Sequence, residues 1–167
     1  KGLPEDKDER DKSLLVVEEL LRFYPDKSPM IIVGFLPPYY PHRTNKRETS
    51  RERGLIDVVS QIIAEAKAEF NETLVISEHF ASISDLSYVG FQGKREELVP
   101  LAHNTPGWGV IYDIDLDNLL KLDIPVVNLG PWGKDAHKFM ERMDLEYSLE
   151  VVPRLLESLI EKLAKLE

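Results

Sequence analysis

The sequence predicts an α/β fold with three layers, in which helices cover both faces of a mostly parallel, mixed sheet. Three short apolar runs bounded by turn residues have the composition of buried strands, at residues 30–36, 73–77 and 125–129. Segments with apolar residues at helical spacing stand before, between and after these runs. Because strands that alternate with helices at crossover lengths are typical of parallel sheets, we expect this architecture.

The first half of the chain is predicted to form a helix, a strand and a second helix. Apolar side chains recur at helical spacing over residues 13–23, and Pro25 ends that helix. Residues 30–36 lie between prolines and show no polar alternation, as expected of a central strand covered on both faces. Apolar residues over 55–70 then follow one helical face, and Asn71 closes the second helix.

The second half is predicted to continue the alternation. Its elements are a strand at 73–77, a loop with a short helix at 82–90, irregular chain at 93–107, a short strand at 108–114, a short helix at 116–122 and a strand at 125–129. A long helix over about residues 148–166 follows, with Leu155 and Leu159 in its buried stripe. Pro153 falls in the first turn of this helix, where a missing N–H costs least.

The composition fits one compact domain over residues 1–167, since 43% of the residues are apolar. The net charge of -9 argues against nucleic-acid and anionic-membrane partners, because both need a cationic face. The chain has no cysteine, so any metal must be held by histidine and carboxylates. The charged start lacks the character of a signal peptide, and we expect a cytoplasmic protein.

A strand-end loop that reaches a histidine is the first candidate site. The buried run at 124–129 leads into a loop rich in glycine and proline that ends at His137. Open α/β sheets bind ligands at the carboxyl ends of their strands, so this imidazole could meet a metal or a substrate. The alternative is a hydrogen-bonded surface histidine. The basic run at 42–53 is interpreted as a solvated loop, with an anion-binding patch as the alternative.

Two common motifs are missing from the chain. It has no Gly-x-Ser-x-Gly elbow for a nucleophilic serine. Residues 130–134 carry the glycines and the lysine of a phosphate-binding loop, but the glycines are three apart. Asp135 also follows Lys134 where that pattern requires serine or threonine. The sequence therefore argues against a nucleotide site.

The remaining pattern resembles a family of zinc peptidases that includes aminoacylase, carboxypeptidase G and succinyl-diaminopimelate desuccinylase. In that family a strand leads into a Ser-Asp loop, and a later Ile-Pro strand leads into Gly-Pro-Gly, Ala-His and a glutamate. The loops at 82–88 and 130–137, followed by Glu141, repeat this order. Four longer pieces are similar to one branch of the family, an arginine-utilisation protein of bacteria: residues 37–41, 84–90, 106–110 and 130–137.

The resemblance implies a role for each matching residue. His137 falls on the family's final histidine, a ligand of one ion in a two-zinc centre. Asp85 falls on an aspartate beside the site that orients other groups or the substrate, with a helix cap as the alternative. Ser84 precedes it in the same loop. Glu141 matches the acidic residue after the histidine, with a structural role as the alternative. Trp132, Tyr39 and Tyr40, which stand beside prolines, are interpreted as packing residues, with the lining of a pocket as the alternative.

The resemblance also implies what this stretch lacks. In the family, the remaining zinc ligands and the general base lie upstream of the matching stretch, in a His-x-Asp, a bridging aspartate, a Glu-Glu pair and a further carboxylate. Ser87 stands where many members carry an arginine for the substrate carboxylate. We therefore expect the carboxyl-terminal portion of a zinc amidohydrolase that acts on a small amino-acid derivative, with a role in arginine catabolism. Its partner would be the remaining part of the catalytic domain. The resemblance leaves open whether the protein also forms a homo-oligomer.

By itself, this stretch is expected to be inactive. The alternative from another class is a non-catalytic α/β module that binds a small ligand or a partner, in which His137 is an ordinary loop residue.

Overall fold

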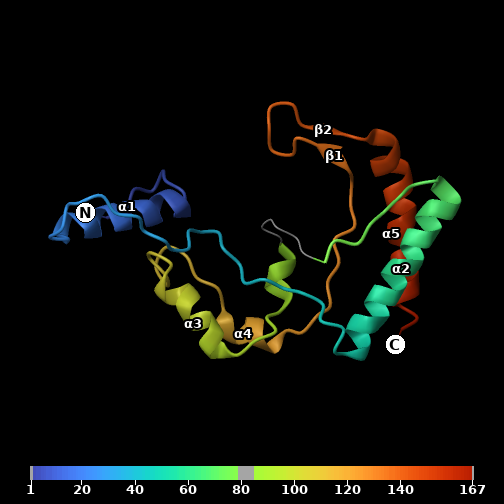
Figure 1. The fold of residues 1–167 in the computed structure, drawn as a ribbon, viewed down its shortest axis with the longest axis horizontal. Coiled ribbons are helices and arrows are strands. Elements are labelled where there is room, and N and C mark those ends of the chain that lie inside the picture. The colour runs from blue at the N-terminus through green and yellow to red at the C-terminus, as the bar shows by residue number, and fades with distance from the viewer. Residues whose placement is uncertain (1, 79–84, 167) are drawn as a thin grey trace. The chain divides into compact units, whose positions relative to one another are not determined.

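The structure is a computed structural model that describes residues 2–78 and 85–166. Its contacts divide the chain into two compact units (Figure 1). The first unit is Lys1–Arg43 with Ala81–Ile124, and the second unit is Thr44–Phe80 with Pro125–Glu167. That residues 1–167 belong to a single domain stays a prediction.

The first unit consists of short helices joined by irregular chain. Its elements are α1 (Glu9–Phe23), the 3₁₀ helix η1 (Asp85–Val89), α3 (Arg95–His103) and α4 (Leu116–Lys121). The carboxylate of Asp8 accepts the N–H of Asp11 at 2.7 Å and so caps α1, because it satisfies one of the free donors of the first turn. α3 and α4 contact each other, and they bury Leu98 and Leu119.

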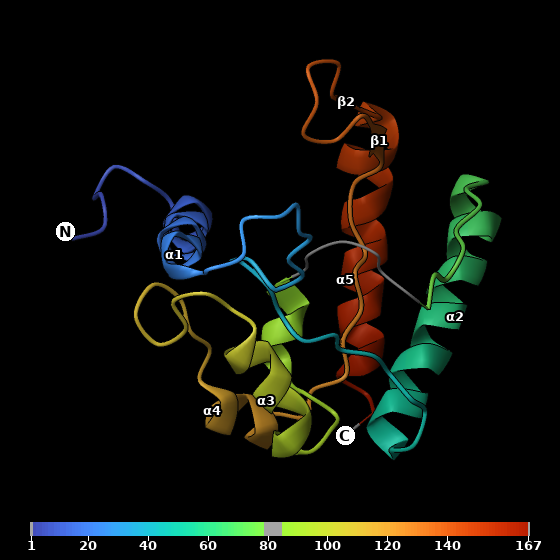
Figure 2. The same ribbon diagram turned by 60° about the vertical axis from the view of Figure 1, so that its left-hand side comes forward.

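Two helices that lie side by side form the core of the second unit (Figures 1 and 2). Its elements are α2 (Ser50–Phe70), the strands β1 (Gly133–Lys134) and β2 (Arg142–Met143), the π-helical turn η2 (Tyr147–Val151) and α5 (Val152–Leu163). The apolar residues of α2 and α5 recur at three- and four-residue spacing, so each set faces the other helix. The buried cluster contains Val58, Ile62, Ala66, Tyr147, Val151, Val152, Leu155 and Leu159.

A buried carboxylate holds the start of α2. The side chain of Glu52 accepts the backbone N–H groups of Lys46 at 3.2 Å, Glu48 at 2.9 Å and Thr49 at 3.3 Å. The hydroxyl of Thr49 in turn accepts the N–H of Glu52 at 3.1 Å, which completes a capping box. Glu52 and Arg43 are both buried, so the prediction of a solvated loop over 42–53 is wrong at these two positions.

The predicted three-layer, mostly parallel sheet is wrong. In the described part of the chain, the paired strands are the antiparallel β1 and β2, with Gly133 opposite Met143 and Lys134 opposite Arg142. The runs predicted as strands carry no ladder: residues 30–36, 73–77 and 125–129. Apolar, β-branched composition favours an extended chain, but a strand also needs a neighbour for its N–H and C=O groups. The pattern of one run does not say where that neighbour lies.

Two of these runs are largely uncovered. Ile31 is 93% exposed and Val33 is 87% exposed in the first run, and Val75 is 86% exposed in the second. The burial of such side chains stabilises a fold by about 25 cal/mol per Å² of apolar surface removed from water. Their burial within a sheet was the basis of the prediction, and it does not occur among the described residues.

The third run, at 125–129, is held by a side chain in place of a neighbouring strand. The amide of Asn45 donates to the carbonyl of Val126 at 2.6 Å, and the N–H of Val126 donates to the Asn45 Oδ1 at 3.1 Å. Val127 and Leu129 then pack against the α2–α5 core. This pair of bonds fixes the segment that leads into the loop of His137.

The predicted helices are mostly present. α1, α2, α4 and α5 correspond to the predictions at 13–23, 55–70, 116–122 and 148–166, although α1 begins earlier and the last helix begins with η2. The segment predicted as irregular, 93–107, contains α3, and the predicted strand at 108–114 is a turn with one bridge between Trp108 and Tyr112. None of the helices in the described ranges is long and apolar enough to cross a membrane.

An ion pair between α2 and α5 makes the stability of the second unit depend on pH. The Glu65 carboxylate lies 2.6 Å from the Lys162 ammonium and accepts the Ser158 hydroxyl at 2.6 Å. The bonds from Lys162 and Ser158 lower the pKa of Glu65 below its ordinary value. A lowered pKa in the folded state stabilises the fold above the unfolded pKa, and this contribution disappears as pH falls through the folded pKa.

The substitution Glu65→Gln is therefore expected to destabilise the second unit by about 0.5–1 kcal/mol near neutral pH, because the pair is partly exposed. The difference from the unsubstituted chain should shrink toward zero when the pH is brought from neutral to well below the lowered pKa of Glu65. Urea unfolding followed by circular dichroism at both pH values measures it. Glu69→Gln, on the exposed side of the same helix, is the matched control. An equal loss at both pH values would contradict the role of the ion pair.

Candidate functional site

His137 lies in the loop of the β1–β2 hairpin, here called the hairpin loop and defined as residues 135–141. Figures 1 and 2 show this loop standing away from α2 and α5. The base of the hairpin is tied to the helix that follows: the N–H of Asp144 donates to the carbonyl of Trp132 at 2.9 Å, and the Asp144 carboxylate accepts the N–H of Tyr147 at 3.0 Å. The hairpin is thus anchored at its base while its loop is exposed.

Local hydrogen bonds give the hairpin loop a defined shape. The guanidinium of Arg142 bonds to the carboxylate of Asp135, and it also donates to the carbonyl of Met140 at 3.0 Å. Inside the loop, the N–H of Lys138 donates to the Asp135 carbonyl at 2.9 Å, and the N–H of Glu141 donates to the Lys138 carbonyl at 3.0 Å. These bonds form two successive turns, and His137 lies in the first of them.

His137 has left-handed backbone geometry, with φ of 60°, and its side chain is exposed. Asp135 has a φ of 56°. Few residues other than glycine adopt this region, although asparagine, aspartate and histidine do so more often than the rest. Two such residues within three positions mark a strained turn, and backbone strain concentrates at functional sites. The loop presents the imidazole to solvent.

The predicted site residues fall in different parts of the structure. His137 and Glu141 share the hairpin loop of the second unit, and both are exposed. Asp85 is the first residue of η1 in the first unit, so the structure gives it no common geometry with His137. Ser84 lies outside the described residues. Of the predicted set, the structure therefore brings together His137 and Glu141.

The histidine and carboxylate side chains within residues 2–78 and 85–166 do not make a zinc centre. Zinc in proteins is bound by three or four protein ligands at about 2.0–2.3 Å. Among residues 2–78 and 85–166, histidine and carboxylate side chains form no group of three that could hold a metal ion. In the hairpin loop, Asp135 is already paired with Arg142. A two-zinc centre therefore does not fit the described residues without further ligands.

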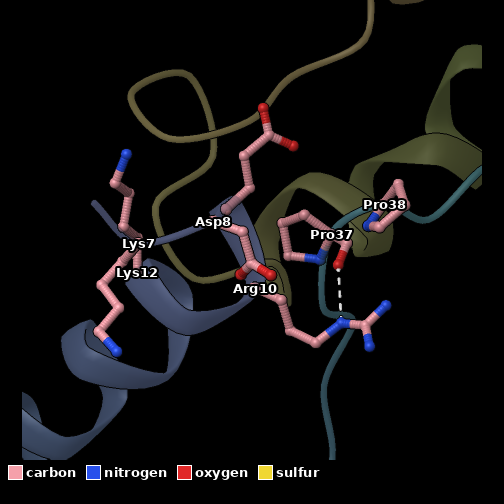
Figure 3. Close-up of a pocket in the computed structure, with 7 residues that line it drawn as sticks. Lys7, Asp8, Arg10, Lys12, Pro37 and Pro38 are labelled. Carbon is pink, nitrogen blue, oxygen red and sulfur yellow. Dashed lines mark hydrogen bonds between the residues drawn. The ribbon is translucent and has the colours of Figure 1, made fainter. Parts of the chain in front are cut away.

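A hollow of about 290 Å³ lies in the first unit where the start of α1 meets Pro37 and Pro38. Figure 3 shows Arg10 reaching to the carbonyl of Pro37, to which its Nε donates at 3.3 Å. In the same view Lys7 and Lys12 lie apart from the two prolines. The cations around this hollow do not converge on one point, so it lacks the arrangement of an anion site.

A second hollow of about 370 Å³, here called the tyrosine pocket, lies in the same unit. Its lining residues are Glu9, Pro38, Tyr40, Tyr88, Gly109, Val110, Ile111, Tyr112 and Asp113. The rings of Tyr40 and Tyr88 are 4.2 Å apart between centroids, and the hydroxyl of Tyr112 donates to the carbonyl of Tyr39 at 2.8 Å. Burial raises the pKa of Tyr112 above its ordinary value, and the negative charge of Glu9 adds to this effect. The pocket thus holds phenol groups beside an acid.

Sequence reasoning missed several residues that organise these regions. Glu52 follows Thr49 by three positions, the spacing of a capping box, and that signal was available. Arg43 and Asn45 gave no comparable signal, because each acts on residues about eighty positions away. Arg43 donates to the Asp123 carboxylate at 3.2 Å and to the Ile124 carbonyl at 3.0 Å, and so closes the first unit.

The chain is similar to two proteins of Bacillus subtilis (strain 168). It is 31% identical to Protein RocB over 148 residues, which are 89% of this chain and 26% of RocB. It is 33% identical to the uncharacterized protein YqjN over 157 residues, which are 94% of this chain and 28% of YqjN. No protein-family model matches the chain. No solved structure matches it either.

The chain therefore spans about a quarter of the length of the relatives it matches. RocB is the branch that the motifs at 37–41, 84–90, 106–110 and 130–137 predicted, and this likeness is confirmed. The finer prediction of a zinc peptidase stays a prediction. What the comparisons show is therefore a likeness of this chain to part of RocB and part of YqjN.

Proposed function

We propose that this chain is one portion of a zinc-dependent amidohydrolase, in which the hairpin loop contributes His137 to a centre completed by the rest of the catalytic domain. The observation that carries the proposal is the exposed imidazole at φ 60° on an anchored hairpin, at the position that resembles the family's final histidine. An imidazole that a turn holds in solvent can complete a site formed on another surface. Glu141, in the same loop, would support it.

Exposed apolar runs support the need for further polypeptide. Residues 30–36 and 73–77 have the composition of buried strands and leave Ile31, Val33 and Val75 in solvent. Strands from the remaining part of the catalytic domain would supply the missing N–H and C=O partners and would cover these side chains. The length of the relatives agrees with this, since the chain matches about a quarter of each.

The proposed substrate is a small amino-acid derivative with an amide bond, and the proposed role is in arginine catabolism in the cytoplasm. Both come from the resemblance. Asp85 would orient groups near the reacting bond, and Ser84 would accompany it in the same loop. Ser87, which replaces the family's arginine, makes a different grip on the substrate necessary.

The test compares zinc binding by this chain with zinc binding by the complete protein from the same reading frame. The complete protein is expected to bind two zinc ions and to hydrolyse amides, while this chain binds no stoichiometric zinc. In the complete protein, His137→Ala should weaken the binding of one ion by more than about 100-fold, since even indirect supporting groups contribute 10–100-fold. His103→Ala, at the exposed end of α3, is the matched control.

Two zinc ions with turnover on this chain alone would contradict the proposal, and so would a His137→Ala protein with unchanged zinc content. A reading frame without a His-x-Asp and a Glu-Glu pair would favour the second candidate. That candidate is a non-catalytic module that binds a small ligand, and the tyrosine pocket is the observation in its favour.

A further inference from the structure

Residues of four segments line the tyrosine pocket, and none of these residues has a role in the proposed zinc chemistry. Glu9 comes from the start of α1. Pro38 and Tyr40 come from the segment after the first apolar run, and Tyr88 comes from η1. Tyr112 comes from the turn that follows Trp108. The last three segments coincide with or adjoin the pieces at 37–41, 84–90 and 106–110, on which the predicted resemblance was based. All lie in the first unit.

The phenol groups of the pocket meet one another. Tyr40 and Tyr88 form a tilted ring pair, with 4.2 Å between centroids and 54° between planes. Tyr88 and Tyr112 share a side-chain hydrogen bond, and the Tyr112 hydroxyl donates onward to the Tyr39 carbonyl. The pocket therefore brings aromatic side chains and their hydroxyl groups together with the carboxylates of Glu9 and Asp113.

The charged residues that line the pocket are acidic. Glu9 and Asp113 are its charged residues, and the described lining contains no lysine or arginine. The neighbouring hollow shares Glu9 and Pro38 with it and is lined, besides Asp8, by the cations Lys7, Arg10 and Lys12. Carboxylates repel anions, and a ring face attracts cations through its quadrupole. The volume of about 370 Å³ falls within the range of about 300–1,000 Å³ that small-ligand pockets occupy.

We propose that the tyrosine pocket binds a small organic cation, a guanidinium or alkylammonium group, between its tyrosine rings and the carboxylates of Glu9 and Asp113. The tyrosine rings would contact the apolar surface of the cation, and the carboxylates would accept its N–H donors. This inference does not rest on the zinc proposal, since no residue of the hairpin loop lines the pocket.

The experiment titrates the chain with butylguanidinium, butylammonium and the neutral analogue butylurea, and follows backbone amide signals by nuclear magnetic resonance. Butylurea has nearly the shape of butylguanidinium without its charge. At least one cation is expected to bind about 3- to 30-fold more tightly than butylurea, the range that a cation on aromatic rings provides. Signals of residues 38–40, 88 and 109–113 should shift. Comparison of the two cations distinguishes a guanidinium site from an ammonium site.

Substitutions at two positions of the pocket, each with a matched control, test its chemistry. Glu9→Gln should weaken cation binding about 3-fold or more, whereas Glu5→Gln, which removes the same charge outside the pocket, should leave it unchanged. Tyr88→Leu should abolish the preference for the cation, and Tyr88→Phe, which keeps the ring, should retain it. Unchanged amide signals elsewhere in each variant show that the fold is intact. Equal binding of butylurea and both cations, or Tyr88→Leu binding like the unsubstituted chain, would overturn the proposal.

Discussion

The substitution Leu155→Ala is expected to destabilise the second unit by about 2–5 kcal/mol, the range for a leucine removed from a packed core. Leu155 is 1% exposed and belongs to the cluster between α2 and α5. This loss of stability has two parts: several methyl and methylene groups are no longer buried, and a cavity remains where they were. Because α2 and α5 share this cluster, the loss should affect both helices.

Amide hydrogen exchange over residues 50–70 and 152–163 measures this effect, since it reports the second unit separately from the first. The matched control is Ile160→Ala, because Ile160 lies on the same helix and is 65% exposed. The control should change stability by less than about 0.5 kcal/mol. Equal effects of the two substitutions would mean that α5 does not pack through the face that contains Leu155.

The substitution Glu52→Ala is expected to destabilise the second unit by about 2–4 kcal/mol. It removes the buried carboxylate that accepts three backbone N–H groups before and at the start of α2. Each buried donor left without a partner costs about 1–3 kcal/mol, and the loss of a helix cap costs about 0.5–2 kcal/mol. Water that reaches the freed donors keeps the total below the sum of these values.

Urea unfolding of Glu52→Ala and Glu69→Ala gives a direct comparison. Both substitutions remove one glutamate from α2, but Glu69 is exposed and has no role in the cap. Glu52→Gln should fall between them, since an amide oxygen still accepts hydrogen bonds while its charge is gone. If Glu52→Ala lost no more stability than Glu69→Ala, the carboxylate would not be the organising group of residues 46–49.

The helices could be predicted from the sequence because their signals are local. The apolar spacing in α2 and α5 corresponds to the face that each buries, and Asn71 ends α2 with a left-handed φ of 58°. α3 was missed because Pro100 lies inside it, although Leu98 and Leu101 are buried at helical spacing. A proline removes one N–H and weakens a helix without excluding it.

The sheet could not be predicted, because strand pairing is a property of two segments. The run at 30–36 has strong strand composition and remains unpaired, whereas β1 has two residues, Gly133 and Lys134, and no strand signal. The bond between Asn45 and Val126 joins residues far apart in the chain, and no spacing rule indicates it. Long-range partners of this kind decide which extended runs become strands.

The candidate site stays a prediction. The loop that ends the run at 124–129 was identified as the place of a functional histidine, and the structure places His137 in a strained, exposed turn. The tyrosine pocket was not identified as a site, since Tyr40, Tyr88 and Tyr112 are separated by long stretches and each resembles a packing residue. Their convergence depends on the fold of the first unit.

At the left-handed turn of His137, substitutions are expected to change stability and activity in opposite directions. Glycine at this position would relieve the backbone, while alanine would increase its strain by about 1 kcal/mol. Selection for folding alone would therefore drift toward glycine at this turn. A library of variants sorted once for thermal endurance and once for biological activity should diverge here, with glycine enriched in the first pool and histidine retained in the second.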